Sequence, residues 1–152
     1  MSKIQSETHS QVNIAKIMIP KVSIATLHAD NTVRQGLELF RHYGYTAVPV
    51  LDENGVYIGS VTEGDFLRHI LSSGTLELRN HEKYKVRQIL REDFCRPLHI
   101  FAPITDLMDA ALRQNFIPIV DDRDCLCGIV TRRSLIQYLS RTDTLYEPED
   151  NI

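Results

Sequence analysis

The stretch Tyr45–Asp65, with the sequence YTAVPVLDENGVYIGSVTEGD, decides the fold of this chain. Its segment 46–51 is short, apolar and rich in β-branched residues, which predicts a buried strand. Turn-forming residues follow, and the next apolar segment, 56–61, predicts a return strand, so the pair makes a hairpin. Thr62 then stands where a helix N-cap belongs, with Asp65 three residues later as in a capping box.

The same pattern occurs a second time in the sequence. Residues 116–134 predict, in the same order, a strand, a turn, a return strand and the start of a helix. The spacing from Pro49 to Gly59 equals the spacing from Pro118 to Gly128. The sequence therefore predicts an internal duplication, which means a fold of two related units.

The two copies resemble the CBS domain, and a tandem pair of them resembles a Bateman module. The residues that carry the resemblance are Val48–Val50 with Gly59–Asp65, and Ile117–Ile119 with Gly128–Ser134. We expect an α/β (α+β) fold in which each repeat runs β-α-β-β-α and the two repeats pack with pseudo-two-fold symmetry. The expected limits are 13–71 for repeat one, 72–83 for a polar linker, 84–140 for repeat two, and 1–12 and 141–152 for flexible tails.

Periodicity predicts the remaining elements of each repeat. Repeat one is expected to begin with a short helix at 13–18, to form a strand over 22–27, and to continue as a helix from the capping cluster 30–32. Repeat two echoes these elements, and its first long helix is expected to turn Ile104, Leu107, Met108, Ala111 and Leu112 inward. Counted from Asn31 and Pro103, repeat two is three residues shorter before its hairpin, so the two clefts between the repeats should differ.

Composition limits the functional classes. The chain has 152 residues, 43% hydrophobic and 24% charged, with a net charge of −3, which is ordinary for a globular protein. This charge gives no general attraction to nucleic acid or to an anionic membrane, and no apolar run approaches the ~20 residues of a membrane span. The N-terminus lacks a signal-peptide pattern, and three cysteines make no disulfide framework, so we expect a cytoplasmic protein.

No metal site, cofactor or catalytic group is expected. Cys125 and Cys127 lie two apart on a predicted strand, and no further ligand pair completes a site near them. The six histidines are scattered and are expected at the surface or at an interface: His9, His28, His42, His69, His81 and His99. Asp52 and Asp121 are turn residues first, because carboxylates at hairpin tips are poorly placed for catalysis.

The segment Thr131–Ser134 departs from the common CBS pattern, because Arg132 and Arg133 occupy the first helical turn. Cations there oppose the helix dipole, which points either to a compensating anionic ligand or to ion pairs with Asp121, Asp122 or Asp124. This variant is similar to the small stand-alone bacterial CBS proteins that bind cyclic di-AMP, the DarB/CbpB type. The resemblance implies a ligand cleft built from Lys21, Ala25, Tyr45, Thr46, Ala47, Val48, Thr131, Arg132 and Arg133.

A second cleft is expected from Thr62, Asp65, Phe116 and Ile117. In the family, the hydroxyl at the position of Thr62 and the carboxylate at the position of Asp65 bind phosphate or the ribose hydroxyls of an adenine nucleotide. Ser134 replaces that carboxylate in the other cleft, so only one of the two clefts keeps it.

The sequence thus predicts a non-catalytic regulator that binds an adenine nucleotide, foremost cyclic di-AMP, forms a homodimer, and signals to an unidentified protein partner. An AMP- or ATP-sensing CBS pair and a ligand-free scaffold or dimerisation module remain as alternatives. An enzyme is disfavoured because no activated nucleophile, metal cluster or phosphate-binding loop is present in the sequence. A DNA-binding regulator is disfavoured because both repeats together leave no segment for a helix-turn-helix.

Overall fold

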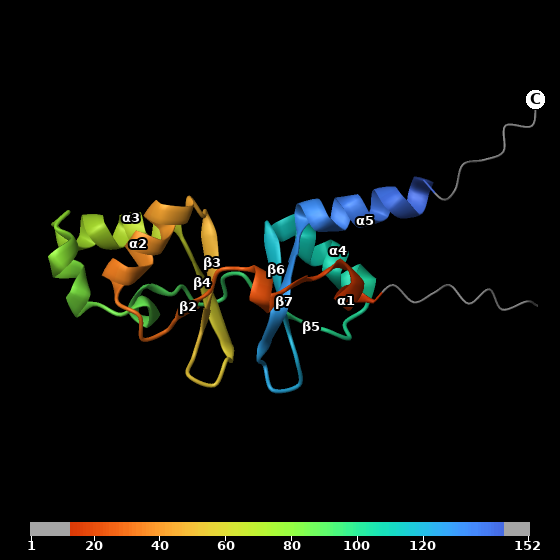
Figure 1. The fold of residues 1–152 in the computed structure, drawn as a ribbon, viewed down its shortest axis with the longest axis horizontal. Coiled ribbons are helices and arrows are strands. Elements are labelled where there is room, and N and C mark those ends of the chain that lie inside the picture. Colours follow the sequence, from red (N-terminus) through yellow and green to blue (C-terminus); the bar gives the residue numbers. More distant parts are fainter. Residues whose placement is uncertain (1–12, 145–152) are drawn as a thin grey trace, which may run out of the picture.

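A computed structural model describes residues 13–144 of the chain, and it consists of two units placed side by side (Figure 1). Each unit is a small sheet with its helices on the outer side, and the two hairpins face each other in the middle. The sheet of the first unit has the order β2 (Leu27–His28), β3 (Ala47–Leu51), β4 (Tyr57–Thr62). The sheet of the second unit has the order β1 (Ile19–Pro20), β7 (Leu126–Thr131), β6 (Phe116–Val120), β5 (Leu98–His99).

The two hairpins are built alike, which confirms the predicted duplication. β3 and β4 pair antiparallel from Ala47 opposite Thr62, and β6 and β7 pair antiparallel from Phe116 opposite Thr131. Both hairpins carry a register irregularity at the same place, before the last residue of the first strand. In both turns one aspartate accepts two backbone N–H groups through Oδ1, as Asp52 and Asp121 do. These aspartates are therefore turn residues, as expected.

Five α-helices and three 3₁₀ helices complete the described part of the chain. The α-helices are α1 (Ile14–Ile17), α2 (Val33–Tyr43), α3 (Glu63–Ser73), α4 (Ile104–Arg113) and α5 (Arg132–Thr144). The 3₁₀ helices are η1 (Lys21–Ser23), η2 (Leu78–Lys83) and η3 (Val86–Ile89). Local signals set the ends of α2, because Thr32 forms a capping box with Gln35 and Gly44 ends the helix in the left-handed region. α5 runs past the expected repeat limit at 140, and the remaining tail residues, 1–12 and 145–152, lie outside the described part.

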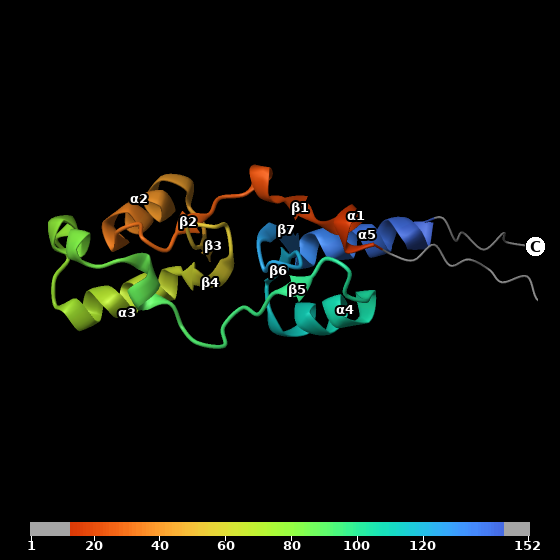
Figure 2. The same ribbon diagram turned by 90° about the horizontal axis from the view of Figure 1, so that it is seen from below.

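The two units exchange their leading segments. Ile14 and Ile17 of α1 are buried in the core of the second unit, and Ile19 of β1 pairs with Ile129 there. In return, Val86 of η3 is buried in the core of the first unit. Figure 2 shows the two connections that cross between the units, one from β1 to β2 and one from η3 to β5. Each structural unit therefore combines the hairpin and long helices of one repeat with the short leading helix of the other.

A third cluster joins the units at the hairpins. Leu51 and Tyr57 from the first hairpin pack with Val120 and Leu126 from the second. Backbone bonds reinforce this contact near the turns, where Val56 forms an isolated antiparallel bridge with Cys125. The hairpins are thus held together at their turn ends.

Several expectations need correction. A strand was expected at 22–27, but the structure has only the short β2 at Leu27–His28. The chain crosses between the sheets at 21–26, where it has no neighbouring strand to bond. Met108 and Leu112 of α4 face outward, since the apolar stripe of this helix is wider than the core it covers. Aligning the first residues of α2 and α4 makes repeat two shorter by two residues, not three, because the N-cap of α2 is Thr32.

The polar linker contains η2, and one histidine in it is not at the surface. His81 of η2 is fully buried, where its Nε2 bonds the carbonyl of Thr75 and its Nδ1 lies 3.2 Å from Nε2 of His69. A polar-looking segment therefore holds one of the most buried side chains of the first unit. Among the described helices, none has both the length and the apolar character needed to cross a membrane.

Candidate functional site

A cavity of about 890 Å³ lies between the two units, where the hairpins diverge from their joined turns. Its volume is near the upper end of the range of ~300–1,000 Å³ that small-molecule sites occupy. The first unit contributes the open end of its hairpin, which is the end away from the turn. The second unit contributes α4, the start of β6 and the segment that leads into β5. The lining residues are Thr46, Ala47, Thr62, Asp93, Phe94, Cys95, Arg96, Pro97, Leu98, Asp106, Asp109, Ala110, Arg113, Gln114, Asn115 and Phe116.

Four of the residues predicted from the sequence share this wall. Thr46 and Ala47 were assigned to one cleft, and Thr62 and Phe116 to the other. The strand register explains why they meet, because Ala47 lies opposite Thr62 at the open end of the first hairpin. Phe116 holds the corresponding position in the second hairpin. One cavity therefore unites residues that the sequence divided between two clefts.

The cavity wall carries charges of both signs. Asp93, Asp106 and Asp109 contribute three carboxylates, whereas Arg96 and Arg113 contribute two guanidinium groups. Arg96 donates to Asp93 over 2.9 Å, and both side chains are exposed. The cavity is thus not a strongly positive site on its own, and polyanions gain little there from its walls alone.

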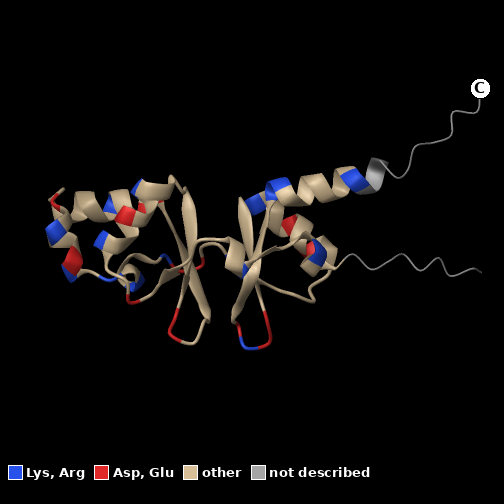
Figure 3. Ribbon diagram, in the orientation of Figure 1, with Lys and Arg blue, Asp and Glu red and all other residues tan. Residues whose placement is uncertain are grey.

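Arg132 and Arg133 open α5 and are not among the residues that line this cavity, but Arg132 bonds its edge. The backbone N–H of Arg132 donates to the carbonyl of Asn115, a wall residue, and its Nε donates over 2.6 Å to the carbonyl of Ala111, next to the wall residue Ala110. Both arginines are exposed, and Figure 3 shows the pair in blue at the start of α5. We call Arg132 and Arg133 the rim arginines.

The contact with Ala111 explains how a cation is tolerated at the start of α5. The carbonyl of Ala111 belongs to the last turn of α4, where a positive charge is favourable. Neither arginine forms a salt bridge with Asp121, Asp122 or Asp124; Asp121 instead bonds backbone N–H groups, and Asp122 pairs with His99 over 2.6 Å. The bond to Ala111 uses one of the five N–H donors of Arg132. No carboxylate among the described residues pairs with either rim arginine.

Lys21 and Ala25 are not brought to the rim arginines. The Nζ atom of Lys21 lies 3.8 Å from the position of a Cβ on Gly55, in the turn of the first hairpin. That turn is at the opposite end of the hairpin from Ala47 and Thr62. Ala25 packs against the core of the first unit.

Three further predicted residues are committed to packing. Val48 and Ile117 are buried in the cores of the first and second units. The ring of Tyr45 stacks on that of Tyr43, with centroids 5.5 Å apart, and also packs on the first core. These side chains support the walls of the cleft and do not line the cavity.

Asp65 forms the expected capping box and is fully occupied by it and by two arginines. Oδ2 accepts from the backbone N–H of Thr62 over 2.8 Å and from its hydroxyl over 3.0 Å. Oδ1 pairs with Arg68 and, over 2.7 Å, with Nε of Arg91. The side chain of Asp65 is 1% exposed, and its four lone-pair positions are used. The expected contact of this carboxylate with a ribose is therefore not available in this structure.

Thr131 and Ser134 repeat the cap without a carboxylate. Ser134 Oγ accepts from the backbone N–H of Thr131 over 2.9 Å, and Thr131 Oγ1 accepts from the N–H of Ser134 over 3.0 Å. The first turn of α3 holds two acidic residues, whereas the first turn of α5 holds none. Of the two helix starts, that of α5 is the more favourable for an anion.

Comparison with known proteins identifies the family. A profile of the CBS domain matches residues 14–72 and 86–141, which is most of the chain. The chain belongs to the CBS domain family. It carries two CBS domains in tandem, as the duplication predicted.

Two kinds of relative are similar to this CBS pair over nearly its whole length. The cyclic di-AMP receptor B of Bacillus subtilis (strain 168) is 25% identical over 141 residues, which are 93% of this chain and 95% of the receptor. The CbpB protein of Listeria monocytogenes, solved in complex with cyclic di-AMP, is 26% identical with a TM-score of 0.73, over 86% of this chain and 97% of that one. A further CbpB, also solved with cyclic di-AMP, has a TM-score of 0.81 at 19% identity, over 90% of this chain and 89% of that one, and supports the fold.

The segment Asp93–Leu98 of the CBS pair forms much of the cavity wall, and the sequence reasoning missed it. Asp93 and Cys95 both adopt the left-handed region, with φ of 54° and 56°. The hydroxyl of Tyr57 donates to the carbonyl of Cys95 over 2.6 Å and meets the hydroxyl of Ser60 at 2.8 Å. Burial raises the pKa of Tyr57 far above its ordinary value and also raises the pKa of the Cys95 thiol. The offset between the repeats was the signal that could have found this segment. It relates Asp93–Leu98 to Lys21–Thr26, which holds the predicted site residues Lys21 and Ala25.

Proposed function

We propose that this CBS pair is a non-catalytic regulator that binds an adenine nucleotide, foremost cyclic di-AMP, between its two units. The observation that carries the proposal is the cavity of about 890 Å³ between the units, next to which Arg132 bonds the wall residue Asn115 and is followed by the exposed Arg133. The similarity to receptors named for cyclic di-AMP supports the same ligand.

An adenine base has a suitable partner in the backbone at Thr46 and Ala47. Both residues lie on the cavity wall at the start of β3, where backbone N–H and C=O groups can bond the edge of a base. The small side chain of Ala47 leaves room for a ring. Guanine presents a different arrangement of donors and acceptors on the same edge, so cyclic di-GMP is expected to be rejected.

The phosphates of the ligand are assigned to the rim arginines. Guanidinium groups bond phosphate oxygens in pairs, and the three carboxylates of the cavity wall disfavour phosphates deeper inside. The start of α5 has no acidic residue in its first turn, so its N–H groups add to the attraction. This assignment retains Thr46, Ala47, Arg132 and Arg133 of the predicted cleft and leaves Lys21 and Ala25 aside.

AMP is the second candidate, and one observation favours it. Asp93, Asp106 and Asp109 on the wall could accept bonds from a ribose diol. AMP has a free 2′,3′-diol, whereas the 3′ oxygens of cyclic di-AMP are esterified. A comparison of these two ligands therefore tests whether the carboxylates of the cavity wall or the rim arginines dominate recognition.

Regulation would follow from the position of the ligand. A molecule that touches both units favours one arrangement of them over others, which a partner protein can recognise.

We propose a homodimer as the regulated form, because Leu67 and Leu71 of α3 and Ile136 of α5 are exposed apolar residues on long helices. We place the protein in the cytoplasm, with no nucleic-acid or membrane partner, since its net charge is −3 and its cysteines are free.

A thermal-shift panel tests the proposal. Cyclic di-AMP, AMP, ATP and cyclic di-GMP are each added to the purified protein, and each nucleotide is recovered afterwards by chromatography. A ligand present at 100 times its Kd raises the free energy of unfolding by about 2.7 kcal/mol. We expect the largest increase in Tm with cyclic di-AMP and full recovery of the nucleotide. A panel without any increase would support the scaffold alternative, and conversion of a nucleotide in many turnovers would support an enzyme.

A further inference from the structure

We propose that Phe94 is a stacking surface for one base of the ligand, and that Arg91, held by the buried Asp65, positions its ring. The inference rests on the proposed function and deepens it, because it names the part of the cavity that takes the base. It also assigns to Asp65 a role that acts through Arg91 and not on the ligand.

Two contacts hold the guanidinium group of Arg91. Its Nε lies 2.7 Å from Oδ1 of Asp65, whose carboxylate is immobilised by the cap with Thr62. Its Cζ lies 3.8 Å from the centroid of the Phe94 ring, so the guanidinium plane covers one face of that ring. A cation over an aromatic face is attracted by the ring quadrupole. The contacts therefore form a chain from the start of α3 to the wall of the cavity.

Phe94 lines two cavities. It lines the large cavity of about 890 Å³ and also a smaller one of about 330 Å³. Arg91 lines only the smaller cavity. We therefore assign the ring face that Arg91 covers to the side of the smaller cavity, and the opposite face to a ligand in the larger one.

The backbone around Phe94 is held in an unusual conformation. Its two neighbours, Asp93 and Cys95, have φ of 54° and 56°, a region that aspartate tolerates but that a cysteine rarely adopts. The hydroxyl of Tyr57 bonds the carbonyl of Cys95 over 2.6 Å and holds this segment in place. Such strain persists only where surrounding contacts enforce it, and it clusters at functional sites. The direction of the Phe94 ring is therefore set before any ligand arrives.

An aromatic face of this kind recognises a base and not a phosphate. Base–aromatic stacking works with any π-face, and the guanidinium behind the ring adds a cation–π contribution. The residue related to Phe94 by the repeat is Val22, which is 93% exposed and has no ring. The stacking surface therefore exists in one half of the cleft only.

The absence of tryptophan from the sequence makes a direct optical test possible. Phe94→Trp places the sole tryptophan at the proposed surface, and stacking with adenine is expected to quench its fluorescence. Cyclic di-AMP is the probe, and ribose 5-phosphate and inorganic pyrophosphate are the base-free controls, which should not quench. In the otherwise unchanged protein, Phe94→Leu is expected to weaken binding of cyclic di-AMP about tenfold by calorimetry, because it keeps an apolar side chain and removes the plane.

The role of Arg91 is tested in the Phe94→Trp background against a matched control. Arg91→Gln removes the group behind the ring, Arg91→Lys keeps the charge beside Asp65 without a planar group, and Arg68→Gln removes the other partner of the same Oδ1. We expect quenching at saturating ligand to fall by at least half in Arg91→Gln, to be intermediate in Arg91→Lys, and to be unchanged in Arg68→Gln. Quenching at saturation does not depend on stability, so a purely structural role of Arg91 would leave it unchanged.

The outcomes separate this inference from the proposed function. If the unsubstituted protein binds cyclic di-AMP, but Phe94→Trp is not quenched and Phe94→Leu binds with unchanged Kd, the stacking surface is wrong and the proposed function stands. Equal quenching in the Arg91 and Arg68 variants overturns the positioning role of Arg91. If the unsubstituted protein binds neither cyclic di-AMP nor AMP, the proposed function and the inference both fall.

Discussion

Ile19 pairs with Ile129 in neighbouring antiparallel strands, although the two residues come from opposite ends of the chain. This pairing places the first described residues on the second unit, where Ile14 and Ile17 are buried in its core. The second unit is therefore completed by a segment that precedes the first unit in the sequence. Loss of that contact would expose the outer strand of the second sheet and part of its core.

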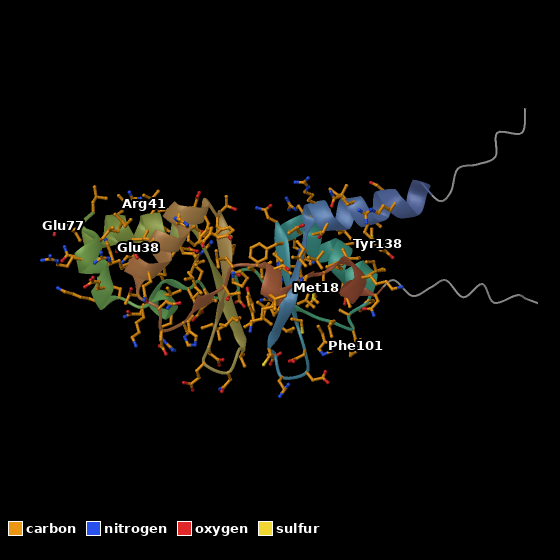
Figure 4. The ribbon with its side chains drawn as sticks, viewed as in Figure 1. Met18, Glu38, Arg41, Glu77, Phe101 and Tyr138 are labelled. Atoms are coloured by element: carbon orange, nitrogen blue, oxygen red, sulfur yellow. The ribbon has the colours of Figure 1, made fainter. Side chains whose placement is uncertain are left out.

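The close approach of β1 to β7 predicts that Gly128→Ala is severely destabilising. A Cβ at Gly128 would lie 2.2 Å from the carbonyl oxygen of Ile19 and 2.8 Å from Cγ of Met18, which Figure 4 shows beside β7. Because one obstacle is backbone, relief requires β1 to move, and we expect a loss of about 3 kcal/mol or more in the free energy of unfolding. Urea denaturation measures this loss.

Gly64→Ala is the control for Gly128→Ala. A Cβ at Gly64 would meet its nearest atom at 3.5 Å, an ordinary contact, and the residue lies in α3. Alanine there should leave the free energy of unfolding unchanged or raise it by up to ~1 kcal/mol. Equal stability of the two variants would contradict the close approach of β1 to β7.

The two helix caps predict unequal losses of stability. Asp65→Ala removes a capping box and the carboxylate that two arginines share, so we expect a loss of about 2–3 kcal/mol in the free energy of unfolding. Ser134→Ala removes a cap without a carboxylate and should cost about 1 kcal/mol. Thermal and urea unfolding of both variants check this order, and a larger loss in Ser134→Ala would contradict it.

The contact between His69 and His81 predicts a pH dependence. Burial, and then the nearby His81, lowers the pKa of His69 from its ordinary 6.5, so the folded protein binds a proton on this ring less readily than the unfolded chain does. Below about pH 6.5 the unfolded chain binds a proton that the folded chain does not bind, and the free energy of unfolding falls as the pH falls. His69→Gln should therefore reduce the slope of the free energy of unfolding against pH between pH 5 and 6.5. The reduction should be at most about the contribution of one bound proton.

His42→Gln is the matched control for that experiment. His42 is exposed in α2 and contacts the ring of Tyr43, with no buried partner like His81. Its substitution should leave the slope close to that of the unsubstituted protein. Equal slopes in all three proteins would show that the contact of His69 with His81 does not control stability in acid.

The exposed apolar residues of the long helices predict a homodimer. We expect sedimentation equilibrium to give about twice the chain mass of 17.4 kDa at micromolar concentration. Leu67→Glu with Leu71→Glu puts two charges on the exposed face of α3 and should yield monomers. Phe101→Glu, which changes an exposed ring outside the helices (Figure 4), should leave the mass unchanged. A monomer without any substitution would contradict the prediction.

Local signals were sufficient for most of the fold. The two hairpins, the cap at Thr62 and the end of α2 at Gly44 follow from turn and capping residues that act within a few positions. The exchange of α1 between the units did not follow, because a short amphipathic helix specifies a buried face but not the core that receives it. The interior place of His81 was also missed, since its polar neighbours in sequence say nothing about Thr75 and His69 in space.

The site was only partly predictable for the same reason. Thr46, Ala47, Thr62 and Phe116 were assigned from the resemblance to CBS proteins, and they do line the cavity. Arg91 and Phe94 belong to no motif, and their importance depends on a contact with Asp65 that only the folded chain creates. Lys21 was assigned by resemblance, and the structure places its amine at the hairpin turn.

The most direct test of the central claim is calorimetry of cyclic di-AMP with two double variants of equal charge change. Arg132→Gln with Arg133→Gln removes the rim arginines, whereas Arg41→Gln with Arg79→Gln removes two exposed arginines that are not on the cavity wall. Charge-assisted hydrogen bonds contribute about 1.5–3 kcal/mol each, so the rim variant should bind at least about tenfold more weakly and the control with unchanged Kd. Unchanged affinity in the rim variant, or tighter binding of AMP than of cyclic di-AMP by the unsubstituted protein, would contradict the account.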